Sequence, residues 1–317
     1  MIVRWGLAGL PAVLEEAGIE RPLLVASSRW NGLVDLPIAG RWTEVPSDRI
    51  KVGADADGLL AIGGGSAIDT AKLASSGSGL PIVSVPTTYS GSEWTPSYGI
   101  RRPDRRMVGG GGGARLAGIV YDVELTIDLP REETVGTALN ALAHCAEALY
   151  LERSPASDRL ACEGATLIAM ALPGVVDVPG DRALREELLR GAAAAGEALA
   201  LAGLGLAHAL AQALGGAFGV PHGAMNALAL PPALRFNAKV VPDQIAMFGR
   251  AIGAEADPAA RVEELARLGG FSCLRDFAIP ETALGEVAVA AAGRIGNRRN
   301  PKPATVEEIA AMLRSIW

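Results

Sequence analysis

Cysteine and histidine are scarce in this sequence of 317 residues, which contains only three of each. The cysteines are Cys145, Cys162 and Cys273, which lie far apart and form no CxxC pair. This spacing argues against a disulfide framework and against a structural zinc site. We therefore expect reduced, mostly buried thiols.

Long hydrophobic runs and an excess of basic residues are also missing. Half of the residues are hydrophobic, but glycine and proline interrupt them, so we expect no apolar run as long as a membrane span. The first residues, MIVRWGLAGLPAVLEEAG, lack the basic start and apolar region of a signal peptide. A net charge of −6 offers no basic surface for nucleic acid. These absences predict a soluble, cytoplasmic protein with a small-molecule ligand and no nucleic-acid or membrane partner.

The chain is long enough for two domains, and its pattern changes near Pro130. Before this point, short apolar runs predict buried parallel strands at Leu23–Ala26, Gly58–Ile62 and Ile82–Val85. A glycine-rich turn and a helix between the last two runs complete a βαβ unit. We therefore predict an α/β dinucleotide-binding domain with a parallel sheet over residues 1–130.

The second part, residues 131–317, is predicted to be all-α. Its Ala- and Leu-rich stretches have helical spacing. The predicted helices are Thr137–Leu151, Ser157–Leu172, Arg182–Leu201 and Leu206–Phe218. Five glycines, Gly109–Gly113, precede this domain and predict either a mobile loop over a cleft between the domains or a plain surface loop.

The turn after the second predicted strand is suited to a phosphate group. Gly63, Gly64 and Gly65 allow close backbone approach, and Ser66 begins the helix whose first N–H groups favour an anion. The next strand ends in VPTTYSGSE, which adds the hydroxyls of Thr87, Thr88, Ser90 and Ser92. Ligands of open parallel sheets bind outside the carboxyl ends of strands, so these strand ends predict one dinucleotide site. Glycine used only for turn geometry is the alternative.

All three histidines lie in the predicted helical domain. Asn140 and His144 are four residues apart and share a helix face, while His208 lies on a later helix and His222 just after it. We expect these four side chains to converge. Satisfied core histidines are the alternative.

Several of these segments, taken together, resemble the iron-containing alcohol dehydrogenases over nearly the whole chain. They include GGGSAIDTAK, TALNALAHCAEALY, GVPHGAMNALALPPALRFNA and NPKPATVEEI. The versions VPTTYSGSEWTPSYG and LNALAHCAEALY are similar to those of the maleylacetate reductases within that superfamily. The resemblance implies the dehydroquinate synthase-like fold of these dehydrogenases, a homodimer, and NADH or NADPH as cofactor.

The resemblance also implies roles for individual residues. The family's metal ligands, an Asp and three His, fall on Asn140, His144, His208 and His222, the four residues predicted to be catalytic. Because a neutral amide replaces the carboxylate at Asn140, we expect no bound metal, as in the similar reductases. Asp69 is added to the cofactor site, and Tyr89 and Arg106 are assigned to the substrate.

Three departures from the reductases stand beside this resemblance, and one of them is that Arg106 stands where a Lys is expected after the WTPSYG stretch. Ala207, Ala209 and Gln212 replace the His and Lys residues that surround the position of His208 in the reductases. The segment between Val34 and Asp57 is also short, as if much of one helix were missing.

The predicted reaction is hydride addition to the alkene of an unsaturated keto acid, with the ketone oxygen becoming negative. His208 and His222, with His144 and Asn140 nearby, would stabilise this oxygen and supply a proton. The substrate carboxylates would be bound by arginines, and the candidates are Arg101, Arg102, Arg106 and Arg235. The alternatives are a metal-dependent alcohol dehydrogenase acting on a small aldehyde or polyol, and a catalytically idle cofactor-binding homologue.

The choice between NADH and NADPH is predicted from the residues after the first strand. Ser27, Ser28 and Arg29 follow it where NAD-specific relatives carry an Asp. Hydroxyls and a guanidinium can receive the 2′-phosphate that a carboxylate would repel. We therefore expect NADPH to be accepted at least as well as NADH.

Overall fold

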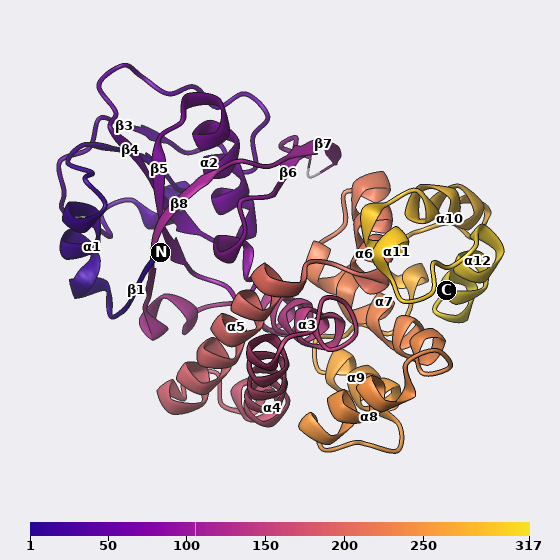
Figure 1. Ribbon diagram of the computed structural model, residues 1–317. Helices are drawn as coiled ribbons and strands as arrows, with labels where there is room; N and C mark the ends of the chain where they lie inside the picture. Colours follow the sequence, from indigo (N-terminus) through magenta and orange to yellow (C-terminus); the bar gives the residue numbers. More distant parts are fainter. Residues whose placement is uncertain (105) are drawn as a thin grey trace. The chain divides into compact units, whose positions relative to one another are not determined.

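The computed structural model describes residues 1–104 and 106–317, which form two compact units (Figure 1). The first unit consists of Met1–Thr88 and Ser92–Leu129, and the second of Tyr89–Gly91 and Pro130–Trp317. The three residues Tyr89–Gly91 therefore pack with helices that follow much later in the chain.

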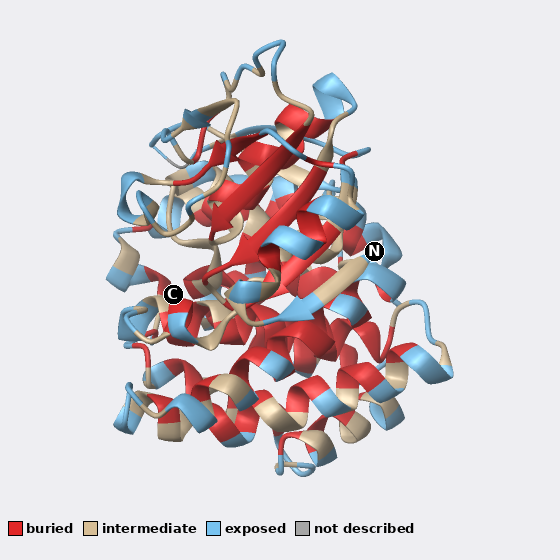
Figure 2. Ribbon diagram, turned by 90° about the vertical axis from the view of Figure 1, so that its left-hand side faces the viewer, coloured by how far each residue is buried: buried red, intermediate tan, exposed pale blue. Residues whose placement is uncertain are grey.

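The first unit contains a six-stranded sheet in which every neighbouring pair is parallel, with the order β1-β8-β5-β4-β2-β3. Its strands are β1 (Ile2–Trp5), β2 (Pro22–Val25), β3 (Gly40–Trp42), β4 (Gly58–Gly63), β5 (Pro81–Pro86) and β8 (Arg115–Tyr121). The three predicted runs are β2, β4 and β5, so these predictions are confirmed. All residues of β2 and β4 are buried, as expected for strands covered on both faces (Figure 2).

Helix α2 (Gly65–Ser78) connects β4 to β5, which confirms the predicted βαβ unit. Helix α1 (Leu10–Glu16) packs beside β8 and buries Leu10, Val13 and Leu14. No helix lies between β3 and β4 in residues 43–57, all of which are described. The short segment noted in the sequence is therefore an irregular connection here.

The glycine run is not a loop, so that prediction is wrong. Residues Met107–Gly111 form strand β7, which pairs antiparallel with β6 (Tyr98–Arg101). Three of the five glycines, Gly109–Gly111, lie in this strand, and the pairing satisfies backbone groups that they would otherwise expose. The Tyr98 side chain occupies the space beside Gly111. A Cβ atom at Gly111 would lie 2.6 Å from the Tyr98 hydroxyl oxygen.

The second unit is helical, as predicted. Helix α3 is almost wholly buried and contacts α4, α5 and α7. The ten helices among the described residues of this unit are α3 (Arg131–Ala148), α4 (Pro155–Asp177), α5 (Arg182–Ala202), α6 (Leu206–Phe218), α7 (His222–Asn237), α8 (Pro242–Ala251), α9 (Pro258–Arg267), α10 (Leu284–Ala292), α11 (Ile295–Arg299) and α12 (Val306–Ser315).

Helix α4 corrects one expectation about hydrophobic runs. It is 23 residues long and, by length and composition alone, apolar enough to cross a membrane. Half of its most apolar window is buried inside the structure, where α4 packs against α3 and α5. Its apolar character therefore matches its place in the core of the helical unit.

Candidate active site

In the first unit, the turn between β4 and α2 has the backbone shape that a phosphate group requires. Gly63 has a φ of 148°, and a Cβ atom there would lie 2.8 Å from the Cβ of Ala67. A Cβ atom at Gly64 would lie 2.8 Å from Cγ2 of Thr88. Both positions therefore need glycine, and the first N–H groups of α2, at Gly65 and Ser66, follow directly.

The end of β5 supplies hydroxyls beside this turn. The Thr87 N–H donates to the carbonyl oxygen of Gly63 at 3.1 Å, which fixes the two strand ends against each other. Oγ1 of Thr88 is buried and has no hydrogen-bond partner among the described residues. A buried hydroxyl without a partner is costly, so it favours a ligand at this position. The turn and these two threonines fit a dinucleotide phosphate.

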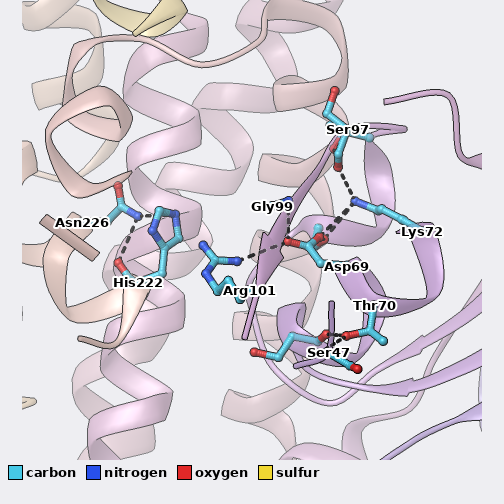
Figure 3. Close-up of polar contacts among 12 residues, drawn as sticks. Ser47, Asp69, Thr70, Lys72, Ser97, Gly99, Arg101, His222 and Asn226 are labelled. Carbon is cyan, nitrogen blue, oxygen red and sulfur yellow. Dashed lines mark hydrogen bonds and ion pairs between the residues drawn. The ribbon is translucent and has the colours of Figure 1, made fainter. Parts of the chain in front are cut away.

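Asp69 lies one helical turn into α2 and is occupied by internal contacts (Figure 3). Its carboxylate accepts hydrogen bonds from Ser92 Oγ at 2.6 Å and from the Gly99 N–H at 3.1 Å, and it pairs with Arg101 at 3.4 Å. Lys72 Nζ lies 3.6 Å away, and burial lowers the pKa of this lysine although the charge of Asp69 opposes the shift. The network holds the start of β6, and a cofactor role for Asp69 stays a prediction.

Ser27 and Arg29 follow β2, the strand next to β4 in the sheet. Ser27 precedes a short 3₁₀ helix, Ser28–Trp30, and its side chain makes no capping hydrogen bond there. Arg29 is exposed, with its guanidinium carbon 4.9 Å from the ring centroid of Trp30. Stacking on an indole leaves the edge of a guanidinium accessible to an anion.

Tyr89 and Ser90 pack with the helical unit. Tyr89 has no exposed surface, and its hydroxyl accepts a hydrogen bond from Arg185 Nη1 at 3.1 Å, so its predicted contact with the substrate stays a prediction. Ser90 belongs to the helical unit, where its carbonyl oxygen accepts a hydrogen bond from Asn140 Nδ2 at 2.8 Å. Its predicted contact with the cofactor stays a prediction.

Three of the four arginines proposed for the substrate carboxylates are paired with acidic side chains of the protein. Arg101 pairs with Asp69, Arg102 with Asp48 and Arg235 with Glu263. Arg106 is exposed in the turn between β6 and β7, where its N–H donates to the carboxylate of Asp104 at 3.1 Å.

The four predicted catalytic side chains converge in the helical unit, which confirms the expectation drawn from their spacing. The rings of His144 and His208 stack with centroids 4.6 Å apart, and that of His222 lies 6.0 Å from His208. Oδ1 of Asn140 is 3.3 Å from Nε2 of His208. Asn140, His144 and His208 are buried, whereas His222 is half-buried at the first turn of α7.

Glu147 lies beneath this cluster and holds His208 from the opposite side. Its fully buried carboxylate accepts hydrogen bonds from His208 Nδ1 at 2.7 Å, from the His208 N–H at 3.1 Å and from the Gly205 N–H at 2.7 Å. Asn140, His144 and Glu147 share one face of α3, at spacings of four and three residues. A carboxylate at Nδ1 fixes both the orientation of the imidazole and a hydrogen on that nitrogen.

The orientation of the Asn140 amide decides which atom faces His208. Asn140 directs its NH₂ group at the carbonyl of Ser90, so its oxygen faces His208. That oxygen also accepts a hydrogen bond from Asn226 Nδ2 at 2.7 Å. Both ring nitrogens of His208 therefore face oxygen acceptors, Nδ1 the carboxylate of Glu147 and Nε2 the amide oxygen of Asn140.

The other two histidines differ in their surroundings. Burial, together with the charges of His208 and His222, holds the pKa of His144 well below its ordinary value. Nε2 of His222 lies 3.0 Å from Asn226 Nδ2, which donates also to the carbonyl of His222 at 3.2 Å (Figure 3). The Asn226 side chain therefore holds the His222 ring in place from within α7.

The side chains of the cluster are bonded to one another where a cation would have to bind. Within residues 1–104 and 106–317, no group of three His, Cys, Asp or Glu side chains is placed to hold a metal ion. The NH₂ group of Asn226 contacts two of the four atoms that would be ligands, Asn140 Oδ1 and His222 Nε2. Neutral amides are weak ligands for such ions in any case.

Comparison with known proteins identifies the family. The model of the C-terminal domain of the Fe-containing alcohol dehydrogenase family matches residues 134–317, and the model described as iron-containing alcohol dehydrogenase matches residues 49–113. The chain belongs to the iron-containing alcohol dehydrogenase family. Members of this family are NAD(H)-dependent oxidoreductases, and the present chain is an oxidoreductase of the same kind.

Similar members of the family include several maleylacetate reductases. The chain is 37% identical to maleylacetate reductase 1 of Rhodococcus opacus over 83% of its own length and 74% of the relative's. It is 32% identical to the maleylacetate reductase of Pseudomonas knackmussii over 98% and 93%. The crystal structure of maleylacetate reductase from Rhizobium sp. superposes with a TM-score of 0.87 at 28% identity, covering 100% of this chain and 95% of that one.

The sequence analysis missed Glu147 and Asn226, the two residues that hold the histidines in place. Each follows a predicted residue at helical spacing: Glu147 three residues after His144, and Asn226 four residues after His222. A search along the same helix face for polar partners of each histidine would have found both.

Proposed function

We propose that this oxidoreductase is an NAD(P)H-dependent reductase of maleylacetate that works without a bound metal. Support comes from the relatives named above and from the pairing of Glu147 with His208. That pairing carries the proposal, because it provides a fixed proton donor where a metal-dependent relative would use a cation.

The reaction places specific demands on the residues of this site. The nicotinamide supplies a hydride to the alkene carbon that is far from the ketone, which leaves an enolate. The Nε2–H of His208 donates a hydrogen bond to the enolate oxygen once that oxygen displaces the Asn140 side chain from it. The carbon next to the ketone then takes one proton, and His222, the half-buried histidine, is the residue placed to relay it. The product is 3-oxoadipate.

Glu147 acts as a positioning residue in this scheme. It touches neither substrate nor cofactor. Its carboxylate accepts three hydrogen bonds, which fix the ring of His208, and we propose that its negative charge also favours a second proton on that ring. A donor that is already oriented requires little rearrangement as charge develops on the oxygen.

The turn at Gly63–Ser66 with Thr87 and Thr88 is proposed to bind the cofactor pyrophosphate, and Arg29 the 2′-phosphate of NADPH. We further propose that the protein is cytoplasmic and forms a homodimer. The mass of the purified protein in solution tests the homodimer.

Oxidation of NADH and NADPH by the purified protein, measured with maleylacetate and with a panel of small aldehydes and polyols, tests the proposal. We expect turnover with maleylacetate and little with the others. His208→Ala should lower kcat about a hundredfold with little change in cofactor affinity, as for the loss of one oxyanion donor. Activity confined to aldehydes or polyols would overturn the proposed substrate, and unchanged kcat would remove His208 from the reaction.

A further inference from the structure

The tripeptide Tyr89–Gly91 runs along the face of α3 that carries part of the histidine cluster. Each of its three residues lies against one position on this face, in the order of the chain. The three positions, at spacings of three and four residues, are Thr137, Asn140 and His144. The backbone of the tripeptide is therefore part of the surroundings of the cluster.

Tyr89 anchors the first end of the tripeptide. Its N–H donates to Oγ1 of Thr137 at 3.3 Å, and its hydroxyl accepts a hydrogen bond from Arg185 Nη1 at 3.1 Å. Arg185 is buried as well, and the same Nη1 donates to Oγ1 of Thr134 at 3.0 Å. A buried side chain that is bonded at its far end cannot move without the loss of these contacts. Tyr89 therefore fixes the start of the tripeptide between α3 and α5.

Gly91 is held closely at the other end. Its φ of 73° lies in the left-handed region that favours glycine. A Cβ atom there would lie 3.3 Å from Nδ1 and Cε1 of His144 and 3.4 Å from the Cα of Gly196 on α5. These distances are shorter than the best separation of two carbon atoms, so a methyl group at residue 91 would press against the ring of His144. The tripeptide is therefore fixed at both ends.

The carbonyl of Ser90, between these two ends, helps to set the orientation of the Asn140 amide. A carbonyl oxygen can only accept a hydrogen bond, so it requires the NH₂ group of Asn140 and turns the amide oxygen toward Nε2 of His208. Nδ2 of Asn226 supports the same orientation, because it donates to that amide oxygen at 2.7 Å. If the Ser90 carbonyl moved away, the buried NH₂ group would lose its acceptor. Nε2 of His208, on the other side of the amide, is an alternative acceptor.

We propose that the tripeptide is a positioning element of the active site, in which Tyr89 and Gly91 hold the Ser90 carbonyl and so keep the Asn140 oxygen turned toward His208. This inference rests on the proposed function, since it assumes that Nε2 of His208 donates to the substrate oxygen. A reversed amide would place an NH₂ group at Nε2, which would then accept a hydrogen bond and could not donate one. Tyr89 is thus a positioning residue that acts through Asn140, and a donor that stays oriented needs little rearrangement during the reaction.

Steady-state kinetics of Tyr89→Phe and Gly91→Ala measure the effect on the reaction. Tyr89→Phe removes only a buried hydroxyl and should lower kcat about three- to tenfold, with KM for maleylacetate and for the cofactor nearly unchanged. Gly91→Ala adds the methyl group that presses on His144 and should lower kcat about ten- to a hundredfold. Tyr121→Phe is the matched control, because it removes another buried tyrosine hydroxyl, which donates to Glu93 in the first unit. It should leave kcat unchanged.

A double-mutant cycle tests whether Tyr89 acts through the amide of residue 140. In the Asn140→Ala background, the Ser90 carbonyl has no amide left to orient, so the addition of Tyr89→Phe should change kcat by less than about twofold. An equal loss in the two backgrounds, or an unchanged kcat in Tyr89→Phe and Gly91→Ala, would overturn the proposal. A raised KM for maleylacetate with unchanged kcat in Tyr89→Phe would also overturn it and make Tyr89 a substrate contact.

Imidazole NMR tests the positioning without turnover. The chain contains only three histidines, all in the cluster, so protein labelled with ¹⁵N-histidine gives three ring spectra. We expect Nε2 of His208 to carry a hydrogen in wild type and in Tyr121→Phe. In Tyr89→Phe and Gly91→Ala, this signal should move toward that of a nitrogen without hydrogen. If wild type reduces no maleylacetate, the proposed function fails, while this shift still supports the positioning role. Identical His208 signals in all four proteins refute it.

Discussion

Glu147→Gln is the substitution that should reveal most about the cluster, because it removes a charge and changes little else. The carboxylate accepts three hydrogen bonds, with Oε1 facing the His208 N–H and Oε2 facing both His208 Nδ1 and the Gly205 N–H. A glutamine retains only one oxygen. The least disruptive orientation keeps that oxygen at the site of Oε2 and turns the NH₂ group toward the His208 N–H. One buried N–H then loses its acceptor and faces another donor.

The expected loss of stability follows from these contacts. Removing one partner of a buried ion pair typically costs about 3–5 kcal/mol of stability. Because Glu147→Gln keeps two of the three hydrogen bonds, we expect it to lower the free energy of unfolding by about 3 kcal/mol. For a protein of this size, each kcal/mol lowers Tm by about 2–4 °C, so the expected decrease is about 6–12 °C. Without the carboxylate, His208 should also lose its second proton. Its Nε2 would then be an acceptor facing the oxygen of Asn140, and kcat should fall about a hundredfold.

Thermal unfolding followed by circular dichroism and steady-state kinetics measure the two effects. Glu163→Gln, at an exposed position on α4, is the matched control and should leave both Tm and kcat unchanged. If Glu147→Gln is as stable and as active as this control, His208 is neutral and the ion pair that we infer does not exist. A lower Tm with unchanged kcat would leave Glu147 a purely structural residue.

Three further predictions concern metal, cofactor and pH. The wild-type enzyme should keep its activity in a strong chelator and contain far less than one equivalent of iron or zinc by elemental analysis; stoichiometric metal, with turnover abolished by its removal, would contradict the proposed mechanism. Arg29→Ala should raise KM for NADPH and leave KM for NADH unchanged, whereas a KM ratio unaffected by the substitution would place Arg29 outside the cofactor site. Burial raises the pKa of Glu93 in the folded state, so the folded protein retains this proton above the pH at which the unfolded chain releases it. The stability due to Glu93 is therefore complete below about pH 4.5 and decreases by up to about 1.4 kcal/mol per pH unit until the folded-state pKa is passed. Glu93→Gln should gain stability relative to wild type over this range in urea unfolding at several pH values, and a difference independent of pH would show that the carboxyl is ionised throughout.

The parts of the fold that depend on hydrophobic pattern were predictable from sequence. The runs at β2, β4 and β5 are apolar because both faces of a parallel strand are covered. The strand β7 was not predictable in this way, since three of its residues are the glycines Gly109–Gly111. Its pairing depends on Tyr98, whose side chain fills the space that glycine leaves, and this contact has no signature in local sequence.

The positions of the site residues were predictable where the residues share one helix. They were unpredictable where contacts between residues far apart in the sequence decide them. The spacing of Asn140 and His144 places them together on α3. The burial of Tyr89 depends instead on Arg185, which is far away in sequence and binds its hydroxyl. No local pattern indicates that the segment after β5 packs with the helical unit rather than with the sheet.

The identity of residue 140 and the protonation of His208 depend on each other through the charge of the buried cluster. In the proposed scheme, the cluster with Asn140 contains one negative charge, on Glu147, and one positive charge, on His208, which lie 2.7 Å apart and balance each other without any added ion. An aspartate at this position would add a second negative charge in a place that water does not reach, and a single imidazolium could not balance it. A divalent cation could balance the two carboxylates, provided that His208 gave up a proton to become a ligand. Replacing one carboxylate oxygen by an amide nitrogen therefore changes a cluster that favours a cation into one that favours a hydrogen on Nε2 of His208. This links the amide at residue 140 to the hydrogen bond that His208 donates in the proposed reaction.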